Sequence, residues 1–173
     1  MSIRKKGVDR QMNLLQLTAK TSGLWHVGNK NILNLRVSGS IKFPFEQPYI
    51  NQRLLGFNDL FMQGYEYYVV NGAAGGYAKL SLSRELINTK FHIASKRIKK
   101  INTIPFRLYA KVYGNAGYVY DPQPGTNFLG NKMLYSGGIG VDLVTFYDFI
   151  LRFEWSFNQL GQNDLYLHRK EYF

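Results

Sequence analysis

Apolar and polar side chains alternate strictly along several segments of this chain. The clearest segment runs from Ile104 to Tyr120, where even-numbered positions such as Val112 are apolar and many odd-numbered positions, such as Lys111, are polar or charged. Successive side chains of a β-strand point to opposite faces of a sheet. The alternation therefore predicts a strand with one continuously apolar face and one face that carries charge.

Six further segments show the same alternation, weakly in the first and last: 11–20, 32–42, 77–87, 134–145, 147–158 and 164–173. Strands of soluble sheets are about five or six residues long, whereas a tilted strand needs roughly 9–11 residues to cross a bilayer. The segment lengths favour a membrane barrel over a soluble, aromatic-rich β-sandwich. We expect an all-β chain, an antiparallel transmembrane β-barrel meander of about seven strands.

The composition is compatible with this interpretation. Aromatic residues make up 16% of the chain, with 13 Tyr and 12 Phe, while charged residues make up only 19%. Barrel strands use aromatic side chains in girdles at both membrane interfaces. The chain has no Cys, which excludes disulfides and thiolate metal sites. No stretch approaches the ~18 consecutive apolar residues that a transmembrane helix requires.

The net charge of +11 raises the possibility of nucleic-acid binding. The basic residues gather at the N-terminus and between Lys90 and Lys100, without interleaved aromatics or a recognisable nucleic-acid module. We therefore expect no nucleic-acid partner, and assign these residues to solvated loops or contact with anionic headgroups. The basic start, Met1 to Gly7, lacks the apolar run of a secretory signal. We expect that the signal and further strands belong to a longer parent protein.

The chain shows no pattern that indicates an enzyme. The three histidines, His26, His92 and His168, are scattered, and the glycine-rich segments 72–76 and 137–140 are not Walker motifs. No nucleophile occupies a recognisable elbow. Acidic residues such as Asp142, Asp148 and Glu154 fall where ordinary lumen-facing residues are expected. We predict no catalytic residue, no metal site and no cofactor.

The longest connection, about 43–76, lacks alternation and is rich in aromatics, and long connections of this kind are usually functional. It contains Met62-Gln63-Gly64-Tyr65. With the strand segments 113–118 and 137–142, this connection resembles the BamA/TamA family of outer-membrane barrels, the bacterial surface antigen superfamily, over roughly residues 30–170. The resemblance implies that the connection folds back into the barrel lumen. The glycine at position 64 itself indicates a tight tip that requires positive φ. Tyr65, Tyr67 and Tyr68 are expected to fill lumen space or stack along the wall; a platform for a ligand is the less favoured alternative.

Two positions depart from the family pattern. Gln63 stands where the family has a loop Arg, and Asn115, two residues before Gly117, stands where it has a strand Asp. The resemblance implies that these partners pair in the lumen, where an unpaired charge is costly. Exchanging both for amides keeps a hydrogen-bonding pair, so we expect Gln63 to meet Asn115 across the lumen. The alternative is that each is simply a solvated polar residue.

The resemblance also implies a function. The chain would be the C-terminal part of a sixteen-stranded barrel in the outer membrane of a Gram-negative bacterium, with no POTRA domain of its own and Phe173 as the C-terminal strand signal. Its partners would be the lipid bilayer, client outer-membrane proteins, and periplasmic or lipoprotein accessory subunits, and it would template insertion of client barrels. Two alternatives stay open: a stand-alone small outer-membrane barrel of structural role, and the barrel half of a patatin-type phospholipase.

Overall fold

The computed structural model of the chain describes residues 14–45, 48, 51–56, 60–92, 103–125, 127–145 and 149–170. Within them the fold is all-β: seven strands form one antiparallel sheet and two short strands pair separately. None of these residues belongs to a helix with the length and apolar character of a membrane span. The strands are β1 (Leu15–Val27), β2 (Asn31–Phe43), β3 (Arg53–Leu55), β4 (Val70–Asn71), β5 (Ala74–His92), β6 (Thr103–Tyr120), β7 (Met133–Val144), β8 (Ile150–Asn158) and β9 (Asn163–Lys170).

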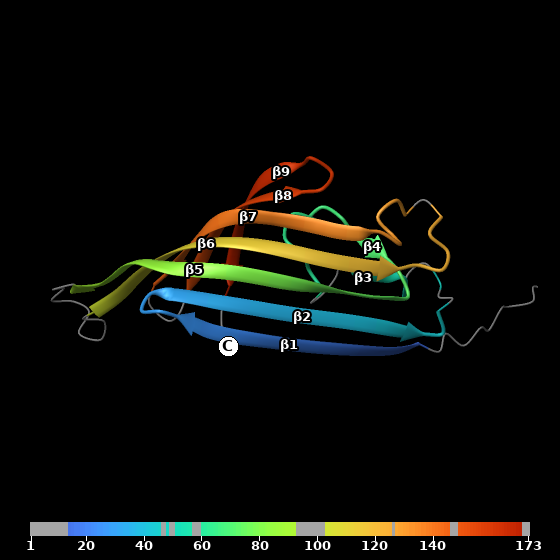
Figure 1. The fold of residues 1–173 in the computed structure, drawn as a ribbon, viewed down its shortest axis with the longest axis horizontal. Helices are drawn as coiled ribbons and strands as arrows, with labels where there is room; N and C mark the ends of the chain where they lie inside the picture. The colour runs from blue at the N-terminus through green and yellow to red at the C-terminus, as the bar shows by residue number, and fades with distance from the viewer. Residues whose placement is uncertain are drawn as a thin grey trace, which may run out of the picture.

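The large sheet is a meander, with strand order β1-β2-β5-β6-β7-β8-β9 (Figure 1). Each predicted strand segment corresponds to one of these strands, so the expected seven-stranded meander is confirmed. The predicted bounds of the first strand, 11–20, are too early, because β1 runs on to Val27. Thr21 and Gly23 lie on the same face as Leu17 and Trp25 and weaken the alternation there.

One face of the sheet is apolar and exposed. Val112, Ile139 and Trp155 are directly opposed on β6, β7 and β8, and about half of each side chain is exposed. The row they belong to is apolar on all seven strands, in register order Trp25, Leu33, Leu82, Val112, Ile139, Trp155 and Leu165. This arrangement is the reverse of a soluble sheet, whose apolar face is covered by a partner layer.

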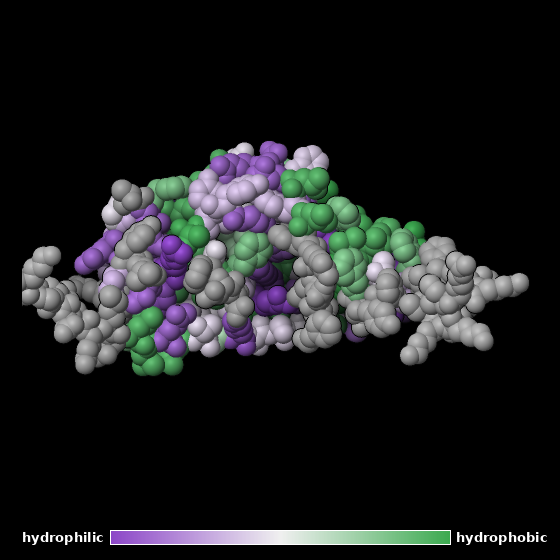
Figure 2. All heavy atoms as spheres, turned by 180° about the vertical axis from the view of Figure 1, so that it is seen from behind, coloured by the Kyte–Doolittle hydropathy of each residue, from purple (hydrophilic) through white to green (hydrophobic). Residues whose placement is uncertain are grey.

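The opposite face is polar and buried. Lys111, Asn115 and Glu154 are all buried there, Glu154 completely, at 0% exposed. The connection between β2 and β5 covers this face and carries the pair β3 and β4. Its apolar side chains form a small core with Tyr77, Val119 and Leu134 of the sheet. In Figure 2, which views the molecule from behind, hydrophilic residues line a hollow near the middle of the face.

The connections differ between the two rims. One rim has the three-residue turn 28–30 and the short β7–β8 connection, where the Thr145 amide donates to the Phe149 carbonyl at 3.0 Å. The other rim has the connections 44–73, 121–132 and 159–162. The predicted separation of short turns from long loops therefore holds for the connections 28–30, 44–73 and 121–132. It does not hold for 159–162, which is shorter than the β7–β8 connection on the other rim. The middle of the β7–β8 turn and Phe173 lie outside the described residues.

Candidate functional site

A row of polar side chains on three neighbouring strands holds the tip of the β2–β5 connection. Asn115, Ser136 and Asn158 are directly opposed on β6, β7 and β8. The Asn115 amide donates to the Gln63 carbonyl at 3.4 Å, and the Ser136 hydroxyl donates to the same oxygen. The Asn158 amide donates to the Gly64 carbonyl at 2.7 Å. Because these bonds go to main-chain oxygens, the row recognises the backbone conformation of the tip and not the identity of its side chains.

The tip residues fit closely against the sheet. Gly64 has a φ of +86°, as expected from its place at the tip. A Cβ atom at Gly117 would lie 3.1 Å from the Met62 sulfur, so this glycine makes room for the buried Met62 side chain. The predicted loop residues and the predicted strand positions thus lie together on the polar face.

Tyr65 is the buried aromatic of the tip. Its hydroxyl donates to the Tyr135 carbonyl at 3.2 Å, and burial raises the pKa of this hydroxyl. Tyr68 packs edge-on against it, with ring centroids 6.1 Å apart. Tyr67 is 76% exposed, but its ring centroid lies 5.9 Å from that of Tyr166, which is on the polar face of β9. Of the two expected placements, filling lumen space or stacking along the wall, Tyr67 therefore has the second.

The expected pair of amide side chains between Gln63 and Asn115 is not formed. Asn115 contacts Gln63 through the Gln63 main-chain carbonyl and not through its side chain. The Gln63 side-chain amide instead donates to the Glu154 carboxylate at 2.7 Å. The expectation of an amide partner did not consider a carboxylate, which is a stronger acceptor when buried. The loop and the strand therefore meet at the expected place, but the Gln63 side chain binds a carboxylate of β8 instead of the Asn115 amide of β6.

Glu154 belongs to a compact cluster of four charges. Lys111 forms ion pairs with Glu154 and, at 3.0 Å, with Asp142. Arg152 donates to both Asp142 oxygens, at 3.0 and 3.2 Å. With two cations and two anions the cluster is internally neutral, which is how a partly buried charge group avoids an uncompensated desolvation cost.

Two glycines of β7 make room for side chains that bridge β6 and β8. Gly140 is opposed to both Lys111 and Glu154, and a Cβ there would lie 3.0 Å from Lys111 Cε. Gly138 occupies the equivalent place between Tyr113 and Ser156, whose hydroxyls are 2.5 Å apart. The glycines of the segment 137–140 thus allow contacts between strands that are not neighbours.

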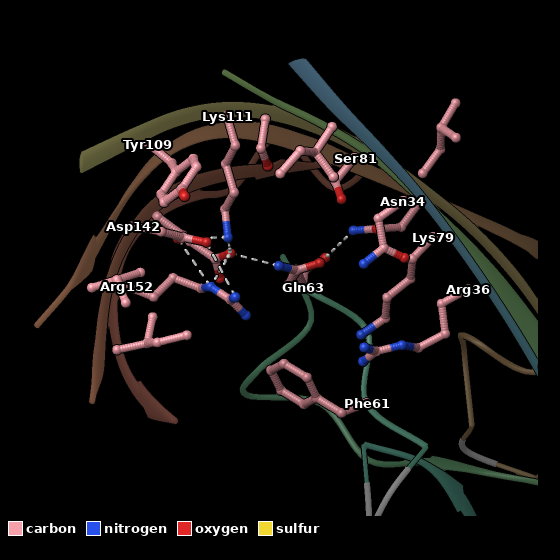
Figure 3. A pocket seen from close by; sticks show the side chains of 17 residues that line it. Asn34, Arg36, Phe61, Gln63, Lys79, Ser81, Tyr109, Lys111, Asp142 and Arg152 are labelled. Atoms are coloured by element: carbon pink, nitrogen blue, oxygen red, sulfur yellow. Dashed lines mark hydrogen bonds and ion pairs between the residues drawn. The ribbon is translucent and has the colours of Figure 1, made fainter. Parts of the chain in front are cut away.

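The charge cluster forms one wall of an open hollow of about 420 Å³. The opposite wall carries Arg36 and Lys79, whose charged ends converge beside Phe61, and Gln63 projects between the two walls (Figure 3). Among the described residues no three His, Asp or Glu side chains are placed to hold a metal ion. The hollow is suited to polar and ionic binding.

Sequence reasoning did not single out Lys111, Arg152 or Arg36 as site residues. Their period-two positions put them on the polar face, but only the cross-strand register shows which of them meet. The alternate glycines at 138 and 140 could have indicated the site, because two glycines on the same face of a strand leave space for side chains of the neighbouring strands. No family model matches this chain, and no curated protein or solved structure is significantly similar to it.

Proposed function

We propose that this chain is the C-terminal part of an outer-membrane barrel of BamA/TamA type, which templates the insertion of client β-barrels. The observation that carries the proposal is the reversed polarity of the sheet. Ile139 and Trp155 are 53% and 48% exposed on one face, while Lys111 and Glu154 are buried on the other. Apolar side chains outside and charged side chains inside are what hydrocarbon and a polar lumen require.

The dimensions of the sheet support a bilayer-spanning role. The register of β5 with β2 comprises eleven pairs, from Asn31 opposite Arg84 to Ile41 opposite Ala74. A tilted strand needs roughly 9–11 residues to cross the hydrocarbon. The part of β5 that is paired on both sides therefore has the length of one crossing.

The docked loop supports the BamA/TamA type within the barrels. The tip Met62-Gln63-Gly64-Tyr65 lies against the polar face, held by side chains of β6, β7 and β8. A loop fixed in this way stiffens the wall next to the strand edge.

The two strand edges support templating. β1 and β9 each have one neighbour among the described strands. Lipid offers no hydrogen-bonding partner, so an edge inside a bilayer requires another strand. In the proposed protein β1 continues into the preceding strands, and β9 offers its backbone to an incoming client by β-augmentation.

Single-cysteine labelling tests the bilayer orientation, and the absence of native Cys makes each label unique. In vesicles containing the chain, a fluorophore on Ile139→Cys or Val112→Cys is expected to be quenched by lipid-attached quenchers, because both positions lie on the apolar face. The matched control Ser81→Cys lies on the polar face and is expected to respond to an aqueous quencher instead. Equal aqueous quenching at all three positions would show that the sheet is not in the bilayer.

A folding assay tests templating. Vesicles that contain the chain are expected to accelerate the folding of an unfolded outer-membrane barrel relative to empty vesicles, because β9 supplies a partner strand. Asp164→Pro and Leu165→Pro remove adjacent N–H groups of β9, one facing β8 and one facing the edge. The substitution that removes the N–H group facing the free edge leaves the β8–β9 bonds intact, so it is identified by its wild-type stability. This variant is expected to lose the acceleration. If the chain spans the bilayer but does not accelerate client folding, the templating role is wrong and a structural barrel is the better interpretation.

A further inference from the structure

Two cations face each other on the wall of the hollow opposite the charge cluster. Arg36 of β2 and Lys79 of β5 are directly opposed in the sheet register. Their side chains extend into the same region of the hollow, with the charged ends close to each other (Figure 3). Directly opposed like charges destabilise a sheet, so this pair requires a compensating interaction.

The described residues do not supply that compensation as an ion pair. Neither Arg36 nor Lys79 lies within ion-pair distance of a carboxylate in the part of the chain that the structure describes. Asp142 and Glu154, on the other wall, are engaged by Lys111 and Arg152. Glu154 and Glu66 attract Lys79 only from a longer range.

The Lys79 ammonium is instead held by aromatic rings. It lies 5.0 Å from the centroid of Phe61 and 4.8 Å from that of Tyr77. Cation–π contacts of this kind fix the position of an ammonium without neutralising its charge. Arg36 is exposed on the open side of the hollow, so its guanidinium can be reached from solution.

The same wall carries neutral hydrogen-bonding groups. Asn34 and Ser81, which are directly opposed next to the two cations on the same face, line the hollow, and Ser83 lines it further along β5. Its volume of about 420 Å³ falls within the range of small-molecule sites, roughly 300–1,000 Å³. The hollow thus combines two positive charges, several hydroxyl and amide groups, and space for a small molecule.

We propose that this hollow binds the phosphate group of a small polar molecule between Arg36 and Lys79. A phosphate monoester carries about −1.5 to −2 charges at neutral pH and three acceptor oxygens, which match two adjacent cations better than one carboxylate does. The guanidinium binds two phosphate oxygens in a bidentate manner, and the ammonium acts as a point charge. The inference does not depend on the proposed function, because it requires only the polar face.

Calorimetry with the full chain in detergent micelles tests the site, with inorganic phosphate and glycerol 3-phosphate as probes. Arg36→Gln and Lys79→Gln are each expected to weaken binding by about tenfold or more, because each removes a charge-assisted contact. Lys132→Gln is the matched control, since it removes the same charge from an exposed connection and is expected to bind like wild type. Equal binding by wild type and the Arg36→Gln/Lys79→Gln double variant, or no binding by wild type, would overturn the proposal.

Two further experiments test whether the bound phosphate belongs to a free metabolite or to a lipid headgroup. A free metabolite as ligand predicts that glycerol 3-phosphate binds in micelles and competes with inorganic phosphate. A lipid headgroup predicts instead that binding requires vesicles with phosphatidic acid and does not occur with phosphatidylcholine. Both results depend on Arg36 and Lys79 if the site is as proposed.

Stability gives an independent readout. Without ligand, Lys79→Gln is expected to raise the urea midpoint of unfolding, because it removes the repulsion from Arg36. Phosphate is expected to raise the midpoint of wild type and of Lys132→Gln, and to raise that of Lys79→Gln clearly less. A phosphate effect that is equal in all three proteins would be a general salt effect and would contradict a site at Lys79.

Discussion

Replacing Glu154 by leucine is expected to lower the free energy of unfolding by about 3–5 kcal/mol, the range found when one partner of a buried ion pair is removed. Glu154 is fully buried and interacts with Lys111, Arg152 and the Gln63 amide. Without it, the four-charge cluster has an excess positive charge in a site with little access to water. The Gln63 amide also loses its acceptor, so the loop tip is expected to loosen.

Urea unfolding of the chain in detergent micelles, followed by tryptophan fluorescence, measures this loss. Glu154→Gln is the matched control, because it keeps the volume and an acceptor for Gln63 and is expected to lose less stability. Combining Glu154→Leu with Lys111→Met removes one charge of each sign and is expected to recover part of the loss. Equal stability of Glu154→Leu and wild type would show that the cluster does not contribute to the fold.

Gly64→Ala is the second change with a large expected effect, about 2–5 kcal/mol of stability. The φ of +86° costs an L-residue about 1–2 kcal/mol. The new methyl group would also lie 2.8 Å from the Ser136 Cβ and 3.3 Å from the Phe157 carbonyl oxygen, and overpacking costs about 1–3 kcal/mol. The tip is expected to move off the polar face, which limited proteolysis at Arg53 would detect as faster cleavage.

Gly161→Ala separates the two causes. Gly161 has a similar φ of +77°, but no atom lies within 4 Å of the position of a Cβ. This substitution is expected to cost only the conformational part, about 1–2 kcal/mol, and to leave cleavage at Arg53 unchanged. Equal losses in the two variants would mean that contact between Gly64 and Ser136 is unimportant for docking.

The strands could be predicted from the sequence because a sheet with one apolar and one polar face repeats every two residues. Val112 and Lys111 fall on opposite faces whatever the neighbouring strands are. The positions of strand ends were predicted less well. The end of β1 at Val27 was missed because Thr21 and Gly23 interrupt its apolar face. The separate pair β3–β4 escaped prediction because its strands have three and two residues, too few to show a period.

The charge cluster could not be predicted because it depends on register. Lys111 meets Glu154 across two strand boundaries, and a shift of either boundary by one residue would turn one partner to the apolar face. The sequence also gives no information on which side chain of the sheet will accept a hydrogen bond from the Gln63 amide. For Gln63 the choice of Glu154 over Asn115 follows from where the tip is held by Ser136 and Asn158.

The unequal strand lengths have a mechanical consequence. β5 is paired with β2 only as far as Arg84, and β6 with β7 only from Arg107. Among the described residues, 89–92 and 103–106 therefore pair only with each other. At roughly 3.3 Å per residue, this two-stranded ribbon of four residue pairs reaches about 13 Å beyond the β6–β7 pairing. It lies on the rim of the short turns (Figure 1). If the sheet spans the bilayer, the end of the ribbon lies beyond the ~8–10 Å over which membrane charge acts at physiological salt. The ribbon is then a spacer that carries its end clear of the headgroups into open water, where a soluble protein can meet it.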